Sequence, residues 1–471
     1  MSSYQDLSLA DAGPRKISTS GRALLADQNF NKGTAFTSSE RAIFGLHGLL
    51  PTNVQTLDQQ AQRAYEQYSS YESDLLKNNF MTSMAEQNIV LYYKLIQDHM
   101  KEMFSIIYTP TEGDAIQNYS REFRRPEGCF LSIKHQDEIE ERMSQFIKPG
   151  SQDGTNGVDY IVVSDGEQIL GIGDQAKKLF PEAYIHFEDF GVTNARRILD
   201  RYRKQYAVFN DDVQGTGCVT LASIIAAAKA SDVKLGDLRV LSFGAGSAGT
   251  GIAGQITAGI ASDKRCSKEE AMKQIFLVDK QGLLLSNDES FLDQKDLKSI
   301  IAEVKPHVLI GTSTVSGAFT EDAVEEMHKH VKQPIIFPRS NPTRLHEAKP
   351  EDLLKWTDGQ ALIATGSPFP PVKYNGEEYT IAECNNSVCF PDAGSGRDCS
   401  SKGAPASKEK DSKKGLCPDV EQAREVSVKI AMGVLRQAAK EDLLGVENVP
   451  LDDEEELKQW IQTQMWKPEY K

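Results

Sequence analysis

The sequence predicts an α/β protein in which a helical N-terminal domain precedes doubly wound parallel-sheet domains. Short apolar runs recur between residues 238 and 364, separated by spacers long enough for helices, which is the pattern of parallel strands joined by crossover helices. Residues 1–126 instead show helical periodicity, clearest at 84–96. A glycine-rich turn at 244–249 follows one apolar run and opens a helix-like stretch, which predicts a Rossmann-like NAD-binding domain.

Four parts of the chain are expected on this basis. They are a helical N-terminal region (1–126), a metal and substrate domain (127–210, completed by 386–445), the Rossmann-like domain (211–385) and a C-terminal tail (446–471). The expected strands are 160–163, 238–243, 275–278, 308–310, 334–337 and 361–364, and the expected helices include 221–230, 248–262, 267–273 and 421–441.

Composition narrows the class of protein. The chain has 471 residues and a net charge of −15, and without a basic stripe this acidity argues against a nucleic-acid partner. It has no run of 18 or more apolar residues, so no membrane span is expected. Seven scattered cysteines without a CxxC pair indicate reduced thiols and no zinc site. We expect a cytoplasmic protein, and a mitochondrial address stays open.

Two short acidic segments suggest a metal site. Segments 187–190 and 209–212 place Glu188, Asp189, Asp211 and Asp212 within 25 residues. Hard divalent cations such as Mg²⁺ and Mn²⁺ prefer anionic oxygen ligands. A solvated acidic pair would explain the second segment alone, but the two segments together favour a metal. A metal beside a dinucleotide predicts redox chemistry on an oxygen-rich substrate.

The glycine-rich turn identifies the expected cofactor residues. They are Gly244, Gly246, Ser247, Ala248 and Gly249. Glycines let the backbone approach a pyrophosphate that sits at the helix N-terminus. Asp279 ends the next expected strand, where a carboxylate binds ribose hydroxyls and repels a 2′-phosphate. This favours NAD, although the adjacent Lys280 weakens the inference and leaves NADP as the alternative.

The chain resembles the malic enzyme family, which includes the malolactic enzymes. The motifs that carry the resemblance occur in the family's order and lie at 31–36, 45–51, 108–113, 164–174, 187–190, 209–216, 340–343, 365–369 and 385–386. Such enzymes oxidise L-malate with NAD or NADP and a divalent metal, then decarboxylate the bound oxaloacetate to pyruvate. The resemblance also implies a homo-oligomer, either a dimer or a tetramer.

The resemblance also implies roles for individual residues. Glu188, Asp189 and Asp212 would be the metal ligands, with Asp211 supporting the catalytic site. Tyr108 would be the general acid that protonates the enolate of pyruvate. Asn341 and Asn386 would lie near malate, and Asn385 would lie beside the nicotinamide. For Asn385, a purely structural role is nearly as well supported.

The chain departs from the family in two places. After Gln175 several tens of residues are missing, including the family's lysine general base, and neither Lys177 nor Lys178 lies in matching surroundings. The polar stretch 392–415 stands where a glycine-rich turn and helix are expected. We therefore expect weak or absent malic enzyme activity. A malolactic reaction (malate to lactate and CO₂) and a non-catalytic NAD-binding subunit are the alternatives, and an incorrectly assembled coding sequence would explain both gaps equally well.

Overall fold

The computed structural model forms two compact units, each described by itself. One comprises residues 1–126 and 459–471 (the N-terminal unit), and the other residues 127–458 (the central unit). The residues described are 17–126, 128–147, 158, 160–164, 183–279, 282–284, 291–292, 296–341, 343–386, 415–446 and 448–471. The expected division of the central unit into a metal domain and a Rossmann-like domain stays a prediction.

The N-terminal unit is helical, as its periodicity predicts. Its elements are α1 (Gly21–Leu25), η1 (Gly33–Ala35), α2 (Ser38–Ile43), α3 (Leu57–Ser69), α4 (Asp74–Gln87), α5 (Ile89–Asp98), α6 (Met100–Ile107) and α7 (Thr111–Gln117). Helices α3 to α6 share a core around Tyr68, Met81, Leu95 and Met103, each at most 1% exposed. Burial of these faces stabilises helices that are too short to persist alone.

The periodic segment 84–96 is two helices rather than one, because Asn88 separates α4 from α5. Asn88 has an extended backbone (φ −157°), and its side chain accepts a hydrogen bond from Leu91 N at 2.9 Å. This side chain satisfies a donor that the first turn of a helix leaves free. It also donates to the Tyr470 hydroxyl at 2.7 Å, which joins the C-terminal segment to this unit.

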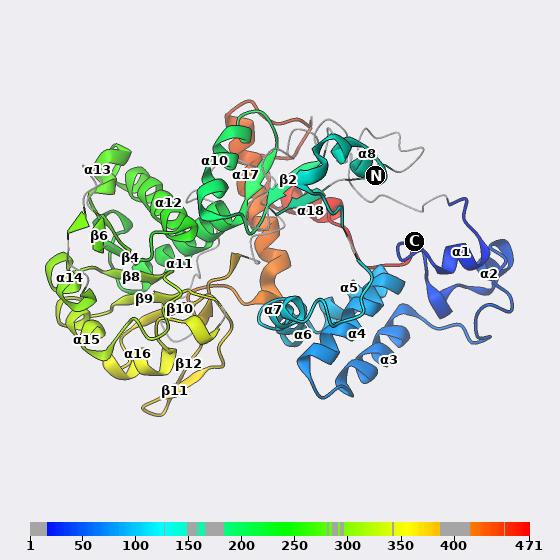
Figure 1. Ribbon diagram of the computed structural model, residues 1–471, viewed down its shortest axis with the longest axis horizontal. Helices are drawn as coiled ribbons and strands as arrows, with labels where there is room; N and C mark the ends of the chain where they lie inside the picture. The colour runs from blue at the N-terminus through cyan, green and yellow to red at the C-terminus, as the bar shows by residue number, and fades with distance from the viewer. Residues whose placement is uncertain are drawn as a thin grey trace. The chain divides into compact units, whose positions relative to one another are not determined.

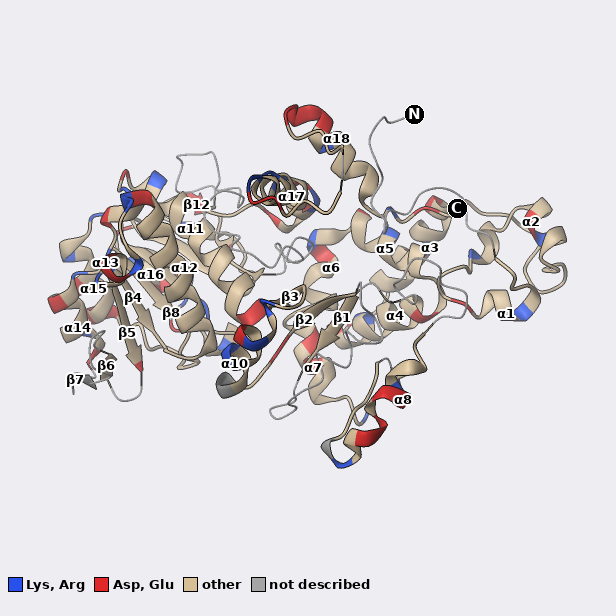
Figure 2. Ribbon diagram, turned by 90° about the horizontal axis from the view of Figure 1, so that it is seen from above, with Lys and Arg blue, Asp and Glu red and all other residues tan. Residues whose placement is uncertain are grey.

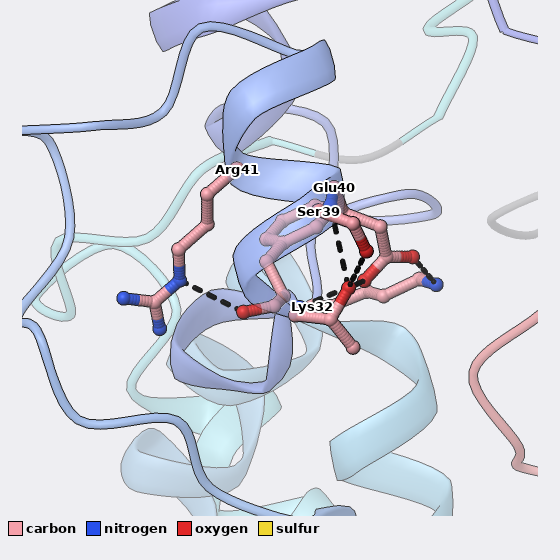
Figure 3. A network of polar contacts seen from close by, with 6 residues as sticks. Lys32, Ser39, Glu40 and Arg41 are labelled. Carbon is pink, nitrogen blue, oxygen red and sulfur yellow. Dashed lines mark hydrogen bonds and ion pairs between the residues drawn. The ribbon is translucent and has the colours of Figure 1, made fainter.

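A buried arginine organises the first residues of the unit (Figure 3). Arg41 is 5% exposed. It donates to backbone carbonyls, including those of Phe36 at 2.8 Å, Thr34 at 3.0 Å and Pro51 at 2.6 Å. Beside it, Glu40 accepts from Lys32 Nζ at 2.6 Å and completes the capping box of α2. The guanidinium thus replaces water for several loop carbonyls at once.

Substitution of Arg41 by methionine is expected to lower the free energy of unfolding by about 3 kcal/mol, because it leaves buried carbonyls unpaired. Urea unfolding followed by circular dichroism measures this change. The exposed Arg22 provides the matched control, and Arg22→Met is expected to change stability by less than about 0.5 kcal/mol. Equal effects of the two variants would contradict a structural role for the buried guanidinium.

The central unit contains an eight-stranded sheet in the order β13-β10-β9-β8-β4-β5-β6-β7. Its strands are β4 (Val240–Phe243), β5 (Ile275–Asp279), β6 (Gly282–Leu284), β7 (Phe291–Leu292), β8 (Val308–Gly311), β9 (Ile335–Pro338), β10 (Leu362–Thr365) and β13 (Ala382–Glu383). Strands β13, β10, β9, β8, β4 and β5 pair in parallel. The parallel Rossmann-like sheet is therefore confirmed.

Helices cover both faces of this sheet, as Figure 1 shows. One face packs against α11 (Thr216–Ala230), α12 (Ser247–Lys264) and α13 (Lys268–Met272); the other packs against α14 (Leu297–Val304), α15 (Glu321–His330) and α16 (Pro350–Trp356). Successive residues of one strand point to opposite faces, so Ile310 belongs to the first core and Leu309 to the second. Burial on both sides explains why the strands read as continuous apolar runs.

Two details of the sheet differ from a purely parallel pattern. Strand β6 pairs antiparallel with β5, and β7 pairs antiparallel with β6. Strands β11 (Val372–Tyr374) and β12 (Glu377–Tyr379) form a separate antiparallel hairpin. These strands have two or three residues each, which is too short for an alternating pattern to be recognised.

A second, three-stranded parallel sheet lies in the same unit. It consists of β1 (Tyr160–Val163), β2 (Tyr184–Phe187) and β3 (Val208–Asn210), in that order. The helices α8 (Ile139–Ser144) and α10 (Val192–Tyr202) contribute to its core. The expected strand 160–163 is confirmed, and β2 and β3 end directly at the two acidic segments.

The remaining helices agree with their sequence patterns. Helix α17 (Ala423–Lys440) falls within the expected helix 421–441, and α18 (Glu454–Gln464) begins with three glutamates, seen in Figure 2. The stretch 211–230 is long and apolar enough to cross a membrane by length and composition, but 67% of it is buried inside the protein. It is the core helix that packs on α12.

Candidate active site

The two acidic segments meet at one edge of the small sheet. Strands β2 and β3 are parallel neighbours, with Phe187 opposite Asn210. Glu188 and Asp189 follow the first strand, and Asp211 with Asp212 follows the second. Because carboxyl ends of adjacent parallel strands lie at the same edge, Asp189 and Asp212 converge although they are 23 residues apart in sequence. Local structure therefore places every predicted acidic residue in one region.

The three predicted ligands come together. One carboxylate oxygen each of Glu188, Asp189 and Asp212 lies within 4.8 Å of the others. The backbone N–H of Asp189 donates to Asp212 Oδ2 at 2.9 Å, which ties the end of β2 to the residues after β3. Asp189 has a left-handed backbone (φ 51°), a conformation that aspartate tolerates better than most residues and that is common at functional turns.

Asp211 lies under this cluster in the π-helical turn η3 (Asp211–Gly215). It is 1% exposed, its Oδ2 accepts a hydrogen bond from Asn386 Nδ2, and its Oδ1 has no hydrogen-bond partner among the described residues. Buried carboxylate oxygens are costly unless a donor or a cation satisfies them. This unpaired oxygen and the all-carboxylate donor set fit a hard divalent cation.

Electrostatics supports the same conclusion. Burial, together with the charges of Glu188 and Asp212, raises the pKa of Asp211 to about 8, although Arg339 opposes the shift. Burial and the neighbouring carboxylates also raise the pKa of Asp212 to about 6 and that of Asp189 above its usual value. The cluster thus concentrates more negative charge than its surroundings neutralise, and a bound cation would remove this cost.

His186 is a site residue that the sequence analysis missed. It is fully buried on β2, its Nε2 lies 2.6 Å from Glu188 Oε2, and its Nδ1 is hydrogen-bonded to the Tyr160 hydroxyl. A neutral imidazole that donates to the carboxylate accepts from the phenol. The signal was present in the sequence, since residues two apart on a strand share a face. His186 therefore fixes the orientation of a predicted metal ligand.

His186→Phe is expected to weaken Mn²⁺ binding about 10- to 100-fold, the usual loss when a partner that orients a metal ligand is removed. Phenylalanine keeps the ring packing against Phe209, whose centroid lies 5.7 Å from the imidazole, so the fold should persist. Isothermal titration with Mn²⁺ measures the affinity. His135→Gln, at an exposed site, is the control, and unchanged affinity in His186→Phe would refute the orienting role.

The glycine-rich turn lies at the switch point of the large sheet, where β4 has β5 on one side and β8 on the other. Gly244 has φ 116° and donates to Val278 O at 2.8 Å. Its carbonyl accepts from Thr312 Oγ1 at 3.0 Å, just beyond β8. Ligands of doubly wound sheets bind in this crevice. Thr312 holds the turn and was not recognised from the sequence.

Helix α12 begins at this turn with Ser247 and Ala248, after the N-cap residue Gly246. The Ser247 Oγ is buried and has no hydrogen-bond partner among the described residues. An anion at a helix N-terminus is stabilised by free N–H groups and the helix dipole. Asp279 ends β5 with an exposed side chain. These placements suit a dinucleotide whose pyrophosphate lies on the turn and whose ribose lies at the next strand.

Two predicted asparagines lie at the ends of neighbouring strands. Asn385 is 2% exposed and donates to Gly366 O at 3.0 Å, while Asn341 Oδ1 accepts from Ser367 Oγ at 2.6 Å. Asn385 follows β13 and Asn341 follows β9, and both of their partners follow β10. Asn386 instead contacts Asp211, so it lies beside the acidic cluster.

Tyr108 belongs to the N-terminal unit. It follows α6 and is partly buried, and its ring is tilted by 42° against that of Phe104, with centroids 5.4 Å apart. The break after Gln175, Lys177, Lys178 and Lys280 lie outside the described residues, as does 392–414.

Comparisons with known proteins show which family the chain resembles. Residues 85–178 match the family model "Malic enzyme, N-terminal domain", and residues 213–439 match "Malic enzyme, NAD binding domain". The mitochondrial NAD-dependent malic enzyme of Saccharomyces cerevisiae is 41% identical over 563 residues, covering 95% of this chain and 82% of the relative. NAD-dependent malic enzyme 3 of Bacillus subtilis is 38% identical over 575 residues, covering 98% of both chains.

A solved malic enzyme from Entamoeba histolytica matches 89% of this chain, and 92% of its own, at 20% identity with a TM-score of 0.47. The alignments to the yeast and Bacillus relatives are longer than the 471 residues of this chain, so both relatives contain positions that it lacks. The internal gap after Gln175 stays a prediction. With matched models over most of its length and relatives near 40% identity, the chain belongs to the malic enzyme family.

Proposed function

We propose that the chain oxidatively decarboxylates L-malate to pyruvate and CO₂ with NAD as the hydride acceptor. The observation that carries the proposal is the convergence of Glu188, Asp189 and Asp212 in a chain of this family. These residues would hold Mg²⁺ or Mn²⁺. When bound, such a cation polarises the C2 oxygen of malate and accepts the charge that develops as CO₂ leaves.

The protein groups have distinct tasks in this reaction. Asn386 and Asn341 would orient malate, and Asn385, fixed by Gly366 O, would position the nicotinamide end of the cofactor. Tyr108 would hold the proton that is delivered to C3 of the enolate. A phenol has an ordinary pKa near 10, so general acid catalysis at neutral pH requires that the surroundings of Tyr108 lower this pKa.

The cofactor preference follows from the end of β5. The Asp279 carboxylate would accept hydrogen bonds from the ribose hydroxyls and repel the additional phosphate of NADP. The yeast and Bacillus relatives are named NAD-dependent enzymes. We infer NAD as the cofactor of this chain, L-malate as its substrate and a homo-oligomer as its assembled form. The cytoplasm remains the expected compartment, with the mitochondrion as the alternative.

Turnover should be low, because the family's lysine base is absent from the sequence after Gln175. Removing a positioned base typically costs about 10²- to 10⁴-fold in rate. We expect this chain's kcat to lie that far below the kcat of the Bacillus relative, measured side by side with malate, Mn²⁺ and either NAD or NADP. A kcat equal to that of the relative would show that another group supplies the base.

Product analysis in the same assay tests the reaction class. Pyruvate and reduced nicotinamide in equal amounts support the proposal. Lactate without net NADH would instead establish the malolactic reaction, and NAD binding without any turnover at saturating Mn²⁺ and malate would establish a non-catalytic subunit.

A further inference from the structure

Two cysteines distant in sequence meet behind the proposed nicotinamide site. Cys384 follows β13 and is fully buried, and Cys417 is partly buried. The hydroxyl of Ser223, on α11, lies 3.2 Å from Cys384 Sγ and 2.9 Å from Cys417 Sγ. Two sulfur atoms that contact one oxygen lie no more than about 6 Å apart. A disulfide has an S–S distance of about 2.05 Å, so both side chains would have to rotate to close this gap.

A buried guanidinium lies beside this pair. Arg339 is 8% exposed and follows β9, and its Nη2 donates to Cys384 O at 2.7 Å. Its Nη1 donates to Thr216 O at 3.1 Å and to the Thr220 hydroxyl. Its Nε has no hydrogen-bond partner among the described residues, and the charge of Arg339 acts on Asp211 without a direct ion pair. A buried cation that lacks a direct ionic partner is costly, and a thiolate at Cys384 would lower this cost.

The titration of the two thiols is consistent with one thiolate and one thiol. Burial alone raises the pKa of Cys384, but the hydrogen bond from Cys417 and the charge of Arg339 outweigh it and lower that pKa to about 6. The hydrogen bond to Cys384 and burial raise the pKa of Cys417 well above its usual range. A thiolate near a cation is the reactive form of cysteine, whereas an isolated buried thiol is inert.

We propose that Cys384 and Cys417 form a redox-active dithiol that a hydroperoxide converts reversibly into a disulfide. The Cys384 thiolate attacks one peroxide oxygen, the O–O bond breaks, and the released hydroxide takes a proton and leaves as water. Cys417 then attacks the sulfur of the sulfenic acid, the S–O bond breaks, and a second water leaves with the Cys417 proton. Two thiols thus lose two electrons to one hydrogen peroxide molecule.

The disulfide would constrain the chain at a functional position. Cys384 immediately precedes Asn385 and Asn386 in the sequence, so a covalent link to Cys417 would fix the end of β13 relative to the residues after 414. Among the described cysteines, Cys384 and Cys417 share one hydroxyl partner, whereas Cys129 is exposed and Cys266 is half-buried. Oxidation is therefore expected to select one pair.

Oxidation of the reduced full-length protein with hydrogen peroxide tests the proposal. Free thiols are alkylated and the protein is digested without reduction. Mass spectrometry is expected to find a peptide joining Cys384 to Cys417 in more than half of the molecules, and dithiothreitol should remove it. Cys384 and Cys417 that both remain alkylatable, or a link from either to Cys389 or Cys399, would overturn the proposal.

Variants separate the two steps. In Cys417→Ser the sulfenic acid of Cys384 should persist and be trapped by dimedone, whereas Cys266→Ser should form the disulfide normally. Arg339→Met is expected to slow the reaction of Cys384 with peroxide at least tenfold, and Arg339→Lys should retain most of the rate. If Arg339→Met fails to fold, the comparison of Cys417→Ser with Cys266→Ser still tests the proposal, because it measures sulfenic acid and disulfide formation and not malate turnover.

Discussion

Asp212→Asn is expected to abolish Mn²⁺ binding at the active site and to lower kcat/KM for malate by more than about 100-fold. This loss exceeds the loss expected when a residue that only orients a metal ligand is removed. Asp212 supplies one of three converging carboxylates and also accepts the backbone N–H of Asp189. Asparagine preserves that hydrogen bond and the side-chain volume. The loss therefore reports on charge and ligation, not on the loop. Titration calorimetry and the steady-state assay measure the two effects.

Asp200→Asn is the matched control for this variant. Asp200 lies on α10 with 52% of its side chain exposed and pairs with Arg196 at 3.1 Å. Exposed ion pairs contribute little, so Mn²⁺ affinity should be unchanged. Wild-type affinity in Asp212→Asn would show that the cation, if present, is held elsewhere.

Substitutions at three glycines distinguish effects on stability from effects on NAD binding. An added Cβ at Gly249 would overlap the Gly244 carbonyl oxygen, whereas an added Cβ at Gly246 or at Gly254 meets nothing within 4 Å beyond its chain neighbours and its own helix backbone. Gly249→Ala should therefore lower stability by about 2 kcal/mol through overpacking and also abolish NAD binding. Gly246→Ala should keep its stability but bind NAD at least about tenfold more weakly, because its methyl group would stand where the backbone approaches the pyrophosphate.

Gly254→Ala, on the same helix, is expected to retain both properties. Thermal unfolding and NAD titration by fluorescence distinguish the three variants. Full NAD affinity in Gly246→Ala would mean that the pyrophosphate does not lie on this turn.

The large sheet was predictable because its strands are buried on both faces. Runs such as 308–310 and 361–364 are apolar throughout, and the intervening helices are regular. The division of 84–96 at Asn88 was not predictable from periodicity, since the apolar spacing continues while one side chain caps a new helix. The short antiparallel strands β6, β7, β11 and β12 were missed because they depend on pairing with neighbours, not on a pattern of their own.

The acidic cluster could be predicted from two motifs at the ends of strands, but the residues that hold its members in place could not. His186 and Thr312 act through contacts with residues far along the chain or across a strand pair. Arg339 and Cys384, 45 residues apart, become neighbours only through the order of β9, β10 and β13. Sequence motifs identify the residues that contact a ligand, whereas tertiary packing determines which other residues hold those residues in position.

A crystal of the protein grown with Mn²⁺ and NAD, measured at the manganese absorption edge, tests the central claim most directly. One strong anomalous peak bounded by oxygens of Glu188, Asp189 and Asp212 is expected. A peak at another site, or no peak while these three side chains point apart, would contradict it.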